Sequence, residues 1–228
     1  LDLPSLSYPA LTKTRQRIVN ATARASATKH AARTFDLGPA QAAELQHNLQ
    51  LHEAPTLPAV ERYTGVLYDA LDVASLTATQ RRRLDARVSI GSALFGLVRA
   101  DDRIPAYRLS GGTKLPRQGT LASVWRPALR RVLRELAQEG LVVDLRSGTY
   151  AALAPLPEAV TVRVLTERED GSRSVVSHFN KATKGQVARL LGSAAAPCSS
   201  VEDVMEAVEQ GGLRVERAGA LQLDVITT

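Results

Sequence analysis

The polar residues between positions 99 and 114 are the first candidates for chemistry in this chain. Four cations and a phenol fall within sixteen residues: Arg99, Arg103, Tyr107, Arg108 and Lys114. Guanidinium and ammonium groups bind phosphate and carboxylate oxygens, so this set indicates anion recognition. The segment follows an apolar, β-leaning run, and a rigid element that delivers a polar loop is a common way to position a site. An internal salt-bridge network with the two neighbouring aspartates is an equally open interpretation.

The same segment ends in a glycine-rich turn, Ser110-Gly111-Gly112-Thr113-Lys114. Flexible backbone amides beside a lysine suit an anion, so the turn is a weak candidate for a phosphate cradle. An ordinary solvated turn remains the competing interpretation.

Other common sites lack the residue spacing that they require. No Gly-x-Ser-x-Gly, GxGxxG or P-loop motif occurs. His47 and His52 are five residues apart without a well-placed third ligand, and Cys198 is the only cysteine. We therefore expect no resident metal and no cofactor, and no catalytic acid, base or nucleophile stands out.

Charge is distributed unevenly along the sequence. The net charge is +6 with a pI near 9.8, which favours polyanionic partners. Three stretches contain 18 of the 29 Lys and Arg and no acid, namely 3–35, 103–134 and 171–201. If these stretches share a face, they form a positive surface that suits nucleic acid.

Residues 120–139 predict the clearest amphipathic helix. Leu121, Trp125 and Leu129 recur on one face, whereas Arg126 and Arg130 start a row of arginines spaced by four on the other. This helix would bury the tryptophan side of its surface and expose the arginine row.

The remaining pattern interleaves helices and strands without strict alternation. We expect helices at 11–32 (with a break near residue 28), 40–51, 79–87, 181–191 and 201–210, and strands at 141–145, 160–166, 173–179, 213–217 and 221–226. The predicted fold class is α/β (α+β), a mixed β-sheet surrounded by helices in a single compact domain over 1–228. No apolar run is long enough to span a bilayer, so a cytoplasmic protein without a membrane partner is expected.

Several separate segments carry a resemblance to a known family: RYTGVLYDALD (62–72), SALFGLVRADDRIPAYRLSGGTKLP (92–116), VWRPAL (124–129), LVVDLRSGTYAAL (141–153) and VVSHFNKATKG (175–185). In this order they resemble the YaaA-type peroxide-stress proteins, in an actinobacterial-like branch. The resemblance implies a role in hydrogen peroxide resistance, with DNA binding and protection against free iron. It also implies a short strand and loop ahead of Leu1, which is not an initiator methionine.

The resemblance adds candidate residues to those found from chemistry. Ser147 and Tyr150 match one family pattern and Lys181 matches another, in which Lys184 stands for an arginine and loses its bidentate fork. The candidate nucleic-acid or anion-binding residues are then Arg99, Arg103, Arg108, Lys114, Arg126, Arg130, Lys181 and Lys184. The candidate pocket residues are Tyr63, Tyr107, Trp125, Asp144, Ser147 and Tyr150.

Two functions remain open. The first is a non-catalytic stress-response protein that binds duplex or branched DNA on a basic surface, tolerant of sequence, and limits iron and peroxide damage. The alternative is an enzyme that acts on a small anionic or nucleotide-like ligand in a polar pocket. Convergence of the pocket residues on one site would favour the alternative.

Overall fold

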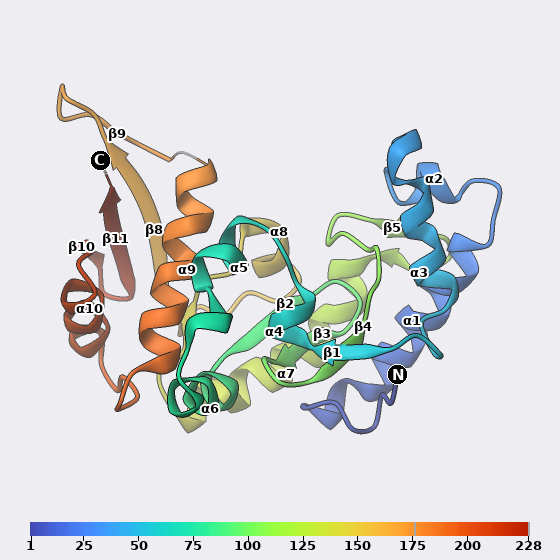
Figure 1. The fold of residues 1–228 in the computed structure, drawn as a ribbon, viewed down its shortest axis with the longest axis horizontal. Coiled ribbons are helices and arrows are strands. Elements are labelled where there is room, and N and C mark those ends of the chain that lie inside the picture. Colours follow the sequence, from blue (N-terminus) through green and yellow to red (C-terminus); the bar gives the residue numbers. More distant parts are fainter. Residues whose placement is uncertain (176, 228) are drawn as a thin grey trace. The chain divides into compact units, whose positions relative to one another are not determined.

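A computed structural model describes residues 1–175 and 177–227 of the chain (Figure 1). Its contacts group the chain into two compact units, each assembled from several segments. Unit 1 comprises Leu1–Arg62, Ser89–Arg134 and Arg146–Leu156, and unit 2 comprises Tyr63–Val88, Glu135–Leu145 and Pro157–Thr228. The assignment of 1–228 to a single domain stays a prediction.

Unit 1 combines short helices with three two-stranded antiparallel ladders. The ladders pair β1 with β4, β2 with β3, and β5 with β6. Its elements are η1 (Pro9–Leu11), α1 (Thr12–Ser26), α2 (Ala31–Thr34), η2 (Pro39–Glu44), α3 (Leu45–Leu49), β1 (Thr56–Pro58), α4 (Ala59–Arg62), β2 (Ser89–Ser92), β3 (Gly96–Arg99), β4 (Arg103–Pro105), β5 (Lys114–Leu115), β6 (Gly119–Thr120), the first fourteen residues of α7 (Leu121–Glu139), and α8 (Gly148–Ala151).

Two large side chains organise the core of unit 1. Trp125 of α7 is fully buried, and its indole N–H donates to the carbonyl of Ala93 at 2.9 Å. Gly96 has a φ of 77°, and a Cβ there would lie 2.7 Å from the Trp125 ring, so only glycine fits. Arg15 of α1 is also fully buried and donates to the carbonyls of Phe95 and Leu97 at 3.0 and 2.6 Å. Burial lowers the pKa of Arg15 to about 10, although Asp102 opposes that shift.

Unit 2 contains the mixed sheet. The strand order is β10-β11-β8-β7, with β9 pairing to β8; β11 and β7 run parallel to β8, and the other pairs are antiparallel. Its elements are α5 (Val66–Leu71), η3 (Val73–Ser75), α6 (Ala78–Arg87), β7 (Val143–Asp144), β8 (Val160–Glu167), β9 (Arg173–Ser174), α9 (Ser177–Ser193), α10 (Val201–Gln210), β10 (Arg214–Gly219) and β11 (Gln222–Thr227).

The core of unit 2 is almost entirely aliphatic. The alternating valines of β8 pack with valines of α10, β10 and β11 and with Val187 of α9. On another part of α9, Gly185 allows close packing against α5, because a Cβ at Gly185 would lie 2.1 Å from the carbonyl oxygen of Leu67. The sheet and its helices confirm the predicted fold class.

Most predicted elements are confirmed, with one clear exception. The break near residue 28 separates α1 from α2, and the predicted helices at 79–87, 120–139 and 201–210 correspond to α6, α7 and α10. The predicted strand at 173–179 is wrong beyond Ser174, because α9 already begins at Ser177; residue 176 lies outside the described residues. Val175 precedes the helix, and residues 177–179 belong to the first turn of α9, whose Val187 packs in the core with the valines of β8. None of the described helices is both long and apolar enough to cross a membrane.

Candidate anion-binding site

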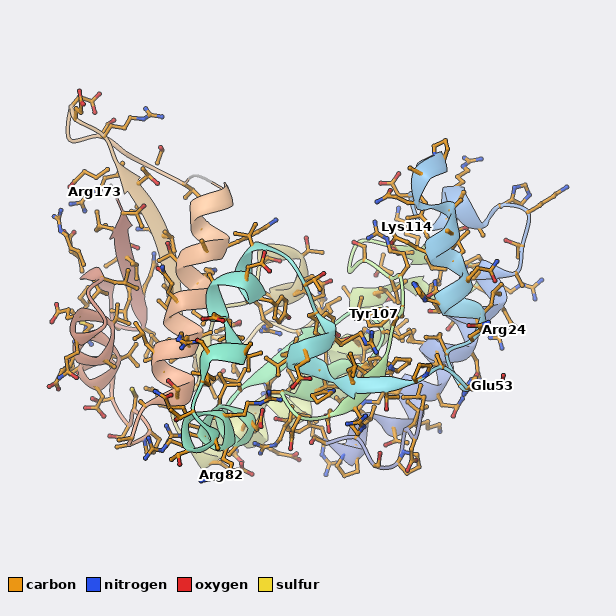
Figure 2. All side chains as sticks on the ribbon, viewed as in Figure 1. Arg24, Glu53, Arg82, Tyr107, Lys114 and Arg173 are labelled. Atoms are coloured by element: carbon orange, nitrogen blue, oxygen red, sulfur yellow. The ribbon has the colours of Figure 1, made fainter. Side chains whose placement is uncertain are left out.

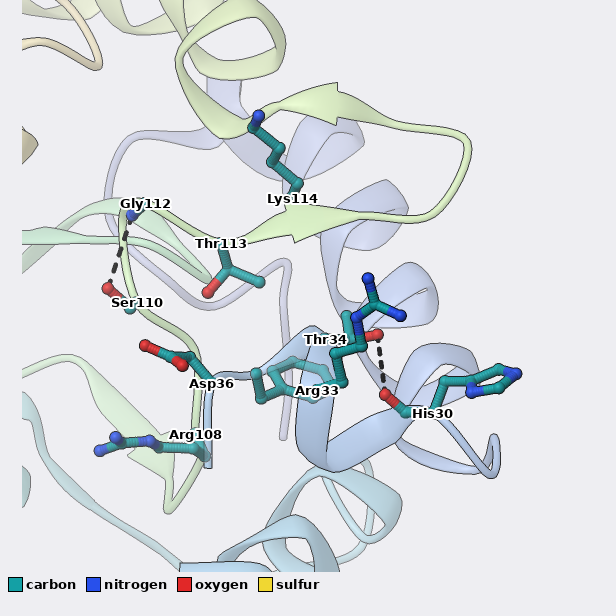
Figure 3. Close-up of a pocket in the computed structure, with 10 residues that line it drawn as sticks. His30, Arg33, Thr34, Asp36, Arg108, Ser110, Gly112, Thr113 and Lys114 are labelled. Carbon is teal, nitrogen blue, oxygen red and sulfur yellow. Dashed lines mark hydrogen bonds between the residues drawn. The ribbon is translucent and has the colours of Figure 1, made fainter. Parts of the chain in front are cut away.

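An open depression of about 840 Å³ lies in unit 1 and is lined mainly by polar residues (Figure 3). Arg33 of α2, Arg108 after β4, and Lys114 of β5 line it from three separate segments. The other lining residues are His30, Thr34, Phe35, Asp36, Ser110, Gly112 and Thr113. Three cations against one carboxylate give the depression a positive lining.

The glycine-rich turn forms one wall of this depression. The amide of Thr113 donates to the carbonyl of Ser110 at 3.0 Å, which closes the turn, and the amide of Gly112 lies 3.5 Å from the Ser110 hydroxyl (Figure 3). A Cβ at Gly111 would lie 2.9 Å from Thr149 Cγ2, whereas nothing lies within 4 Å of one at Gly112. Gly111 therefore packs against α8, and Gly112 faces open space.

Tyr150 of α8 supports the turn from behind. Two of its ring carbons lie 3.8 Å from the Cβ position of Gly111. Burial raises the pKa of Tyr150, although a backbone hydrogen bond from Gly111 and the charge of Arg108 both oppose that shift. The phenol is therefore neutral at pH 7 and acts as a fixed support. Ser147 is exposed just before α8.

Arg108 is held at both backbone groups by one buried side chain. Asn48 of α3 accepts from the Arg108 amide at 2.8 Å and donates to the Arg108 carbonyl at 2.8 Å. The guanidinium itself is partly exposed and lies 3.5 Å from the carboxylate of Glu44. The backbone is therefore fixed, while the charged end has a carboxylate neighbour and open solvent.

The other candidates in the segment 99–108 hold the loop in shape. The Asp102 carboxylate accepts from the backbone amides of Ser7 and Arg99 at 3.0 and 2.9 Å. Arg103 donates to the carbonyl of Thr56 at 2.7 Å, and the Tyr107 hydroxyl lies 2.9 Å from that of Ser92. Arg99 lies over the ring of Tyr8, 5.9 Å from its centroid. These hydrogen bonds of Asp102, Arg103 and Tyr107 therefore fix the shape of the loop.

The arginine row of α7 is exposed. Arg126 donates to the carbonyl of Ala152 at 3.2 Å, and Arg130 and Arg134 face solvent. Trp125, a candidate pocket residue, lies instead in the core of unit 1. Its surroundings leave no surface for a ligand.

The remaining candidates belong to unit 2. Tyr63 stacks on Tyr68 with the ring centroids 5.5 Å apart. Burial lowers the pKa of Lys184, although the charge of Asp144 opposes that shift, and Lys181 is exposed on α9.

The two units differ strongly in net charge. Unit 1 holds 17 Lys and Arg against 7 Asp and Glu, a net charge of +10, whereas unit 2 holds 12 against 16, a net charge of −4. The positive charge that the whole chain shows is therefore a property of unit 1.

Comparison with known proteins identifies the family. A family profile described as "Peroxide stress protein YaaA" matches residues 2–218. The chain belongs to the YaaA peroxide stress protein family. It is 46% identical over 220 residues to a UPF0246 protein of Corynebacterium glutamicum, covering 95% of this chain and 87% of the relative. It is 43% identical over 221 residues to a UPF0246 protein of Streptomyces coelicolor, covering 95% and 85%. The resemblance predicted from the five segments is thus confirmed.

Several residues around the depression of this YaaA family member were not predicted as site residues. Arg33 lies in an acid-free stretch, but the sequence does not show which residues will lie beside it. Asn48 gives no signal at all, because one amide in a short polar helix does not indicate which backbone it will bond. The two hydrogen bonds to Arg108 join positions 60 residues apart.

Proposed function

We propose that this chain acts in the peroxide stress response by binding DNA, without catalysis and without reading base sequence, on the positive surface of unit 1. The single observation that carries the proposal is the net charge of +10 on unit 1. Phosphate neutralisation by Lys and Arg supplies most of the affinity in sequence-tolerant binding.

The exposed cations are suited to this role. Several are held by backbone carbonyls or glutamine rather than by carboxylates: Arg17 donates to Gln118 at 2.5 Å, Arg103 to Thr56, and Arg126 to Ala152. A carbonyl orients a guanidinium without cancelling its charge. These groups therefore keep their attraction for phosphate.

The same binding offers a route to protection against iron. Lys and Arg that neutralise phosphates release the condensed cations around DNA. Iron(II) is among the cations that phosphates collect, so a covered duplex would hold less iron close to its sugars. Protection would then follow from occupancy of the DNA, with no reaction on the protein.

The test is a mobility shift on duplex and branched DNA at increasing salt, with a matched pair of double variants. Arg130→Gln with Arg134→Gln removes two exposed arginines from α7, and Arg82→Gln with Arg83→Gln removes one exposed and one half-buried arginine from α6 (Figure 2 labels Arg82). The α7 variant should lower the slope of log K against log salt by about 2, since each lost phosphate contact contributes about 0.9. The α6 variant should leave it unchanged. Equal effects of the two variants, or no shift of the wild-type protein at low salt, would refute the proposal.

The second candidate is an enzyme for a small anionic ligand, and the depression beside Arg108 favours it. Of the residues expected to converge, Arg108 lines the depression and Tyr150 supports its turn, both in unit 1. Trp125 is buried, and Tyr63, Asp144 and Lys181 belong to unit 2. These contacts support binding of an anion more directly than they support a reaction.

A further inference from the structure

The depression in unit 1 has the composition of a site for a compact oxyanion. Arg33, Arg108 and Lys114 line it from three separate segments, with Asp36 as the one lining carboxylate. In Figure 3 the charged ends of Arg108 and Lys114 point in different directions, so a bound anion would draw these long side chains towards it. The volume of about 840 Å³ is larger than a phosphate needs and leaves room for an attached group of nucleoside size.

The glycine-rich turn adds neutral donors to these charges. The Gly112 amide makes only a long contact of 3.5 Å to Ser110 Oγ, and a Cβ at Gly112 would meet nothing within 4 Å. A ligand oxygen can therefore approach this backbone closely, as in anion-binding turns. The hydroxyl groups of Ser110 and Thr113 line the same wall.

The contact between Arg108 and Glu44 shows that the Arg108 guanidinium can bind an oxyanion. Its guanidinium lies 3.5 Å from the Glu44 carboxylate, both side chains being about two-fifths exposed, at 38% and 40%. Because Asn48 fixes the backbone of Arg108, the guanidinium can change partner without moving the loop. A phosphomonoester carries nearly two negative charges and presents three oxygens, so it should displace a singly charged carboxylate from the guanidinium fork.

We propose that this depression binds a phosphomonoester, with Arg108, Lys114 and Arg33 neutralising the phosphate, the Ser110–Gly112 turn hydrogen-bonding it, and Glu44 occupying Arg108 when the site is empty. The ligand chemistry is shared by small phosphorylated metabolites and by the phosphorylated end of a nucleic-acid strand. This inference goes beyond the proposed DNA binding and does not depend on it.

The test measures binding of adenosine 5′-monophosphate and of adenosine to the full chain by calorimetry at constant ionic strength. Saturable binding of the monophosphate, and at least about tenfold weaker binding of adenosine, is expected. Arg108→Gln should weaken monophosphate binding about tenfold and Lys114→Gln about threefold, whereas Glu44→Gln should tighten it about threefold. Arg24→Gln, an exposed cation of α1 that does not line the depression, is the matched control and should change nothing.

A second arm separates the two sources of phosphate. A short oligonucleotide with a 5′-phosphate should bind more tightly than its 5′-hydroxyl counterpart if strand ends are the ligand, and equally if small metabolites are; either result keeps the site. No saturable binding of the monophosphate, or equal losses for Arg108→Gln and Arg24→Gln in variants with unchanged thermal unfolding, would overturn the proposal. The double variant of α7, Arg130→Gln with Arg134→Gln, separates the two proposals. It should weaken DNA binding and leave monophosphate binding unchanged.

Discussion

The two units of this chain differ in the balance of acceptors for their arginines, although Arg108 of unit 1 contacts Glu44 and Arg87 of unit 2 donates to the carbonyl of Ala194. In unit 1, Arg15, Arg103 and Arg126 donate to backbone carbonyls. In unit 2, Arg163 makes two hydrogen bonds of 2.8 and 2.6 Å to Asp224, and Arg217 pairs with Glu202. A carbonyl accepts hydrogen bonds from a guanidinium and leaves its positive charge in place. A carboxylate accepts the same hydrogen bonds and also neutralises the charge. The number of arginines in a unit therefore does not give the positive charge of its surface unless the hydrogen-bond acceptors of those arginines are known.

Two of the carboxylate-paired arginines of unit 2, Arg173 and Arg214, form a connected group with two glutamates on the sheet. Arg173 donates to Glu167 and Glu216 at 2.8 and 2.6 Å, and Arg214 contacts the same two carboxylates (Figure 2 labels Arg173). Four charges in one group cancel one another. The group can hold β8, β9 and β10 together but can add little to the attraction for phosphate.

The largest effect should follow from removing the buried arginine of unit 1. Arg15→Met would remove the side-chain hydrogen bonds to the buried carbonyls of Phe95 and Leu97, and each lost bond costs about 1–3 kcal/mol. A loss of about 3 kcal/mol in the free energy of unfolding is expected from urea denaturation. Arg81→Met, which removes an i,i+4 pair with Asp85 in unit 2, should cost less than about 0.5 kcal/mol. Similar losses in the two variants would contradict the contrast between the units.

A smaller loss of stability should follow from a methyl group placed in unit 2. Gly185→Ala puts a Cβ 2.1 Å from the Leu67 carbonyl oxygen, so α5 and α9 must separate at a cost of about 2 kcal/mol. Gly140→Ala, where nothing lies within 4 Å, is the control. The folded fraction of the Gly185 variant should bind DNA as the wild type does, because unit 1 keeps its charges. A parallel loss of DNA affinity in folded protein would show that the charge of unit 1 is not sufficient.

The acceptor contrast can be tested directly with one surface arginine from each unit. Arg126→Gln removes a guanidinium held by a carbonyl and should weaken DNA binding about threefold at low salt. Arg214→Gln removes one held by Glu167 and Glu216 and should leave DNA binding unchanged within error. Fluorescence anisotropy with a labelled duplex measures both, and a larger effect at Arg214 would reverse the interpretation.

The smallest effect concerns the free energy of unfolding at acidic pH. Hydrogen bonds from the Ser199 amide and hydroxyl and from Ser200 lower the pKa of Asp203 to about 2 from its ordinary value of 3.8. Because the folded pKa is the lower one, this carboxylate stabilises the fold above about pH 4 and loses that contribution as the pH falls towards 2. Asp203→Asn should therefore flatten the stability curve in this window, measured by urea denaturation at each pH. Ser199→Ala should flatten it partly, and an unchanged curve in both would exclude the effect.

Patterns within one element were readable from the sequence. The apolar stripe of α7 predicted both its bounds and the buried Trp125, and the helix predicted at 201–210 has the bounds of α10. These features depend on neighbours three or four residues away. Local periodicity is therefore enough to predict them.

Contacts between residues that are far apart in the sequence could not be predicted from it. Gly111 was noted as a turn residue, but its need for glycine comes from Thr149, 38 residues later. Arg15 belongs to an acid-free basic stretch of the sequence, although its hydrogen bonds to Phe95 and Leu97 make it a core residue. The sequence shows where the basic residues lie along the chain. Whether a carboxylate neutralises each one or a carbonyl leaves its charge in place is decided by the tertiary structure.

The two hydrogen bonds between the Asn48 side chain and the Arg108 backbone have a consequence for chain length. The side-chain amide of Asn48 donates to the Arg108 carbonyl and accepts from the Arg108 backbone amide. Only one residue can meet both bonds, so the number of residues between β4 and Arg108 is fixed. Adding or deleting one residue there would place a different side chain at the depression and move Gly111 away from Thr149. Related chains that keep this site should therefore vary in length elsewhere, for example at the exposed hairpin around Gly171.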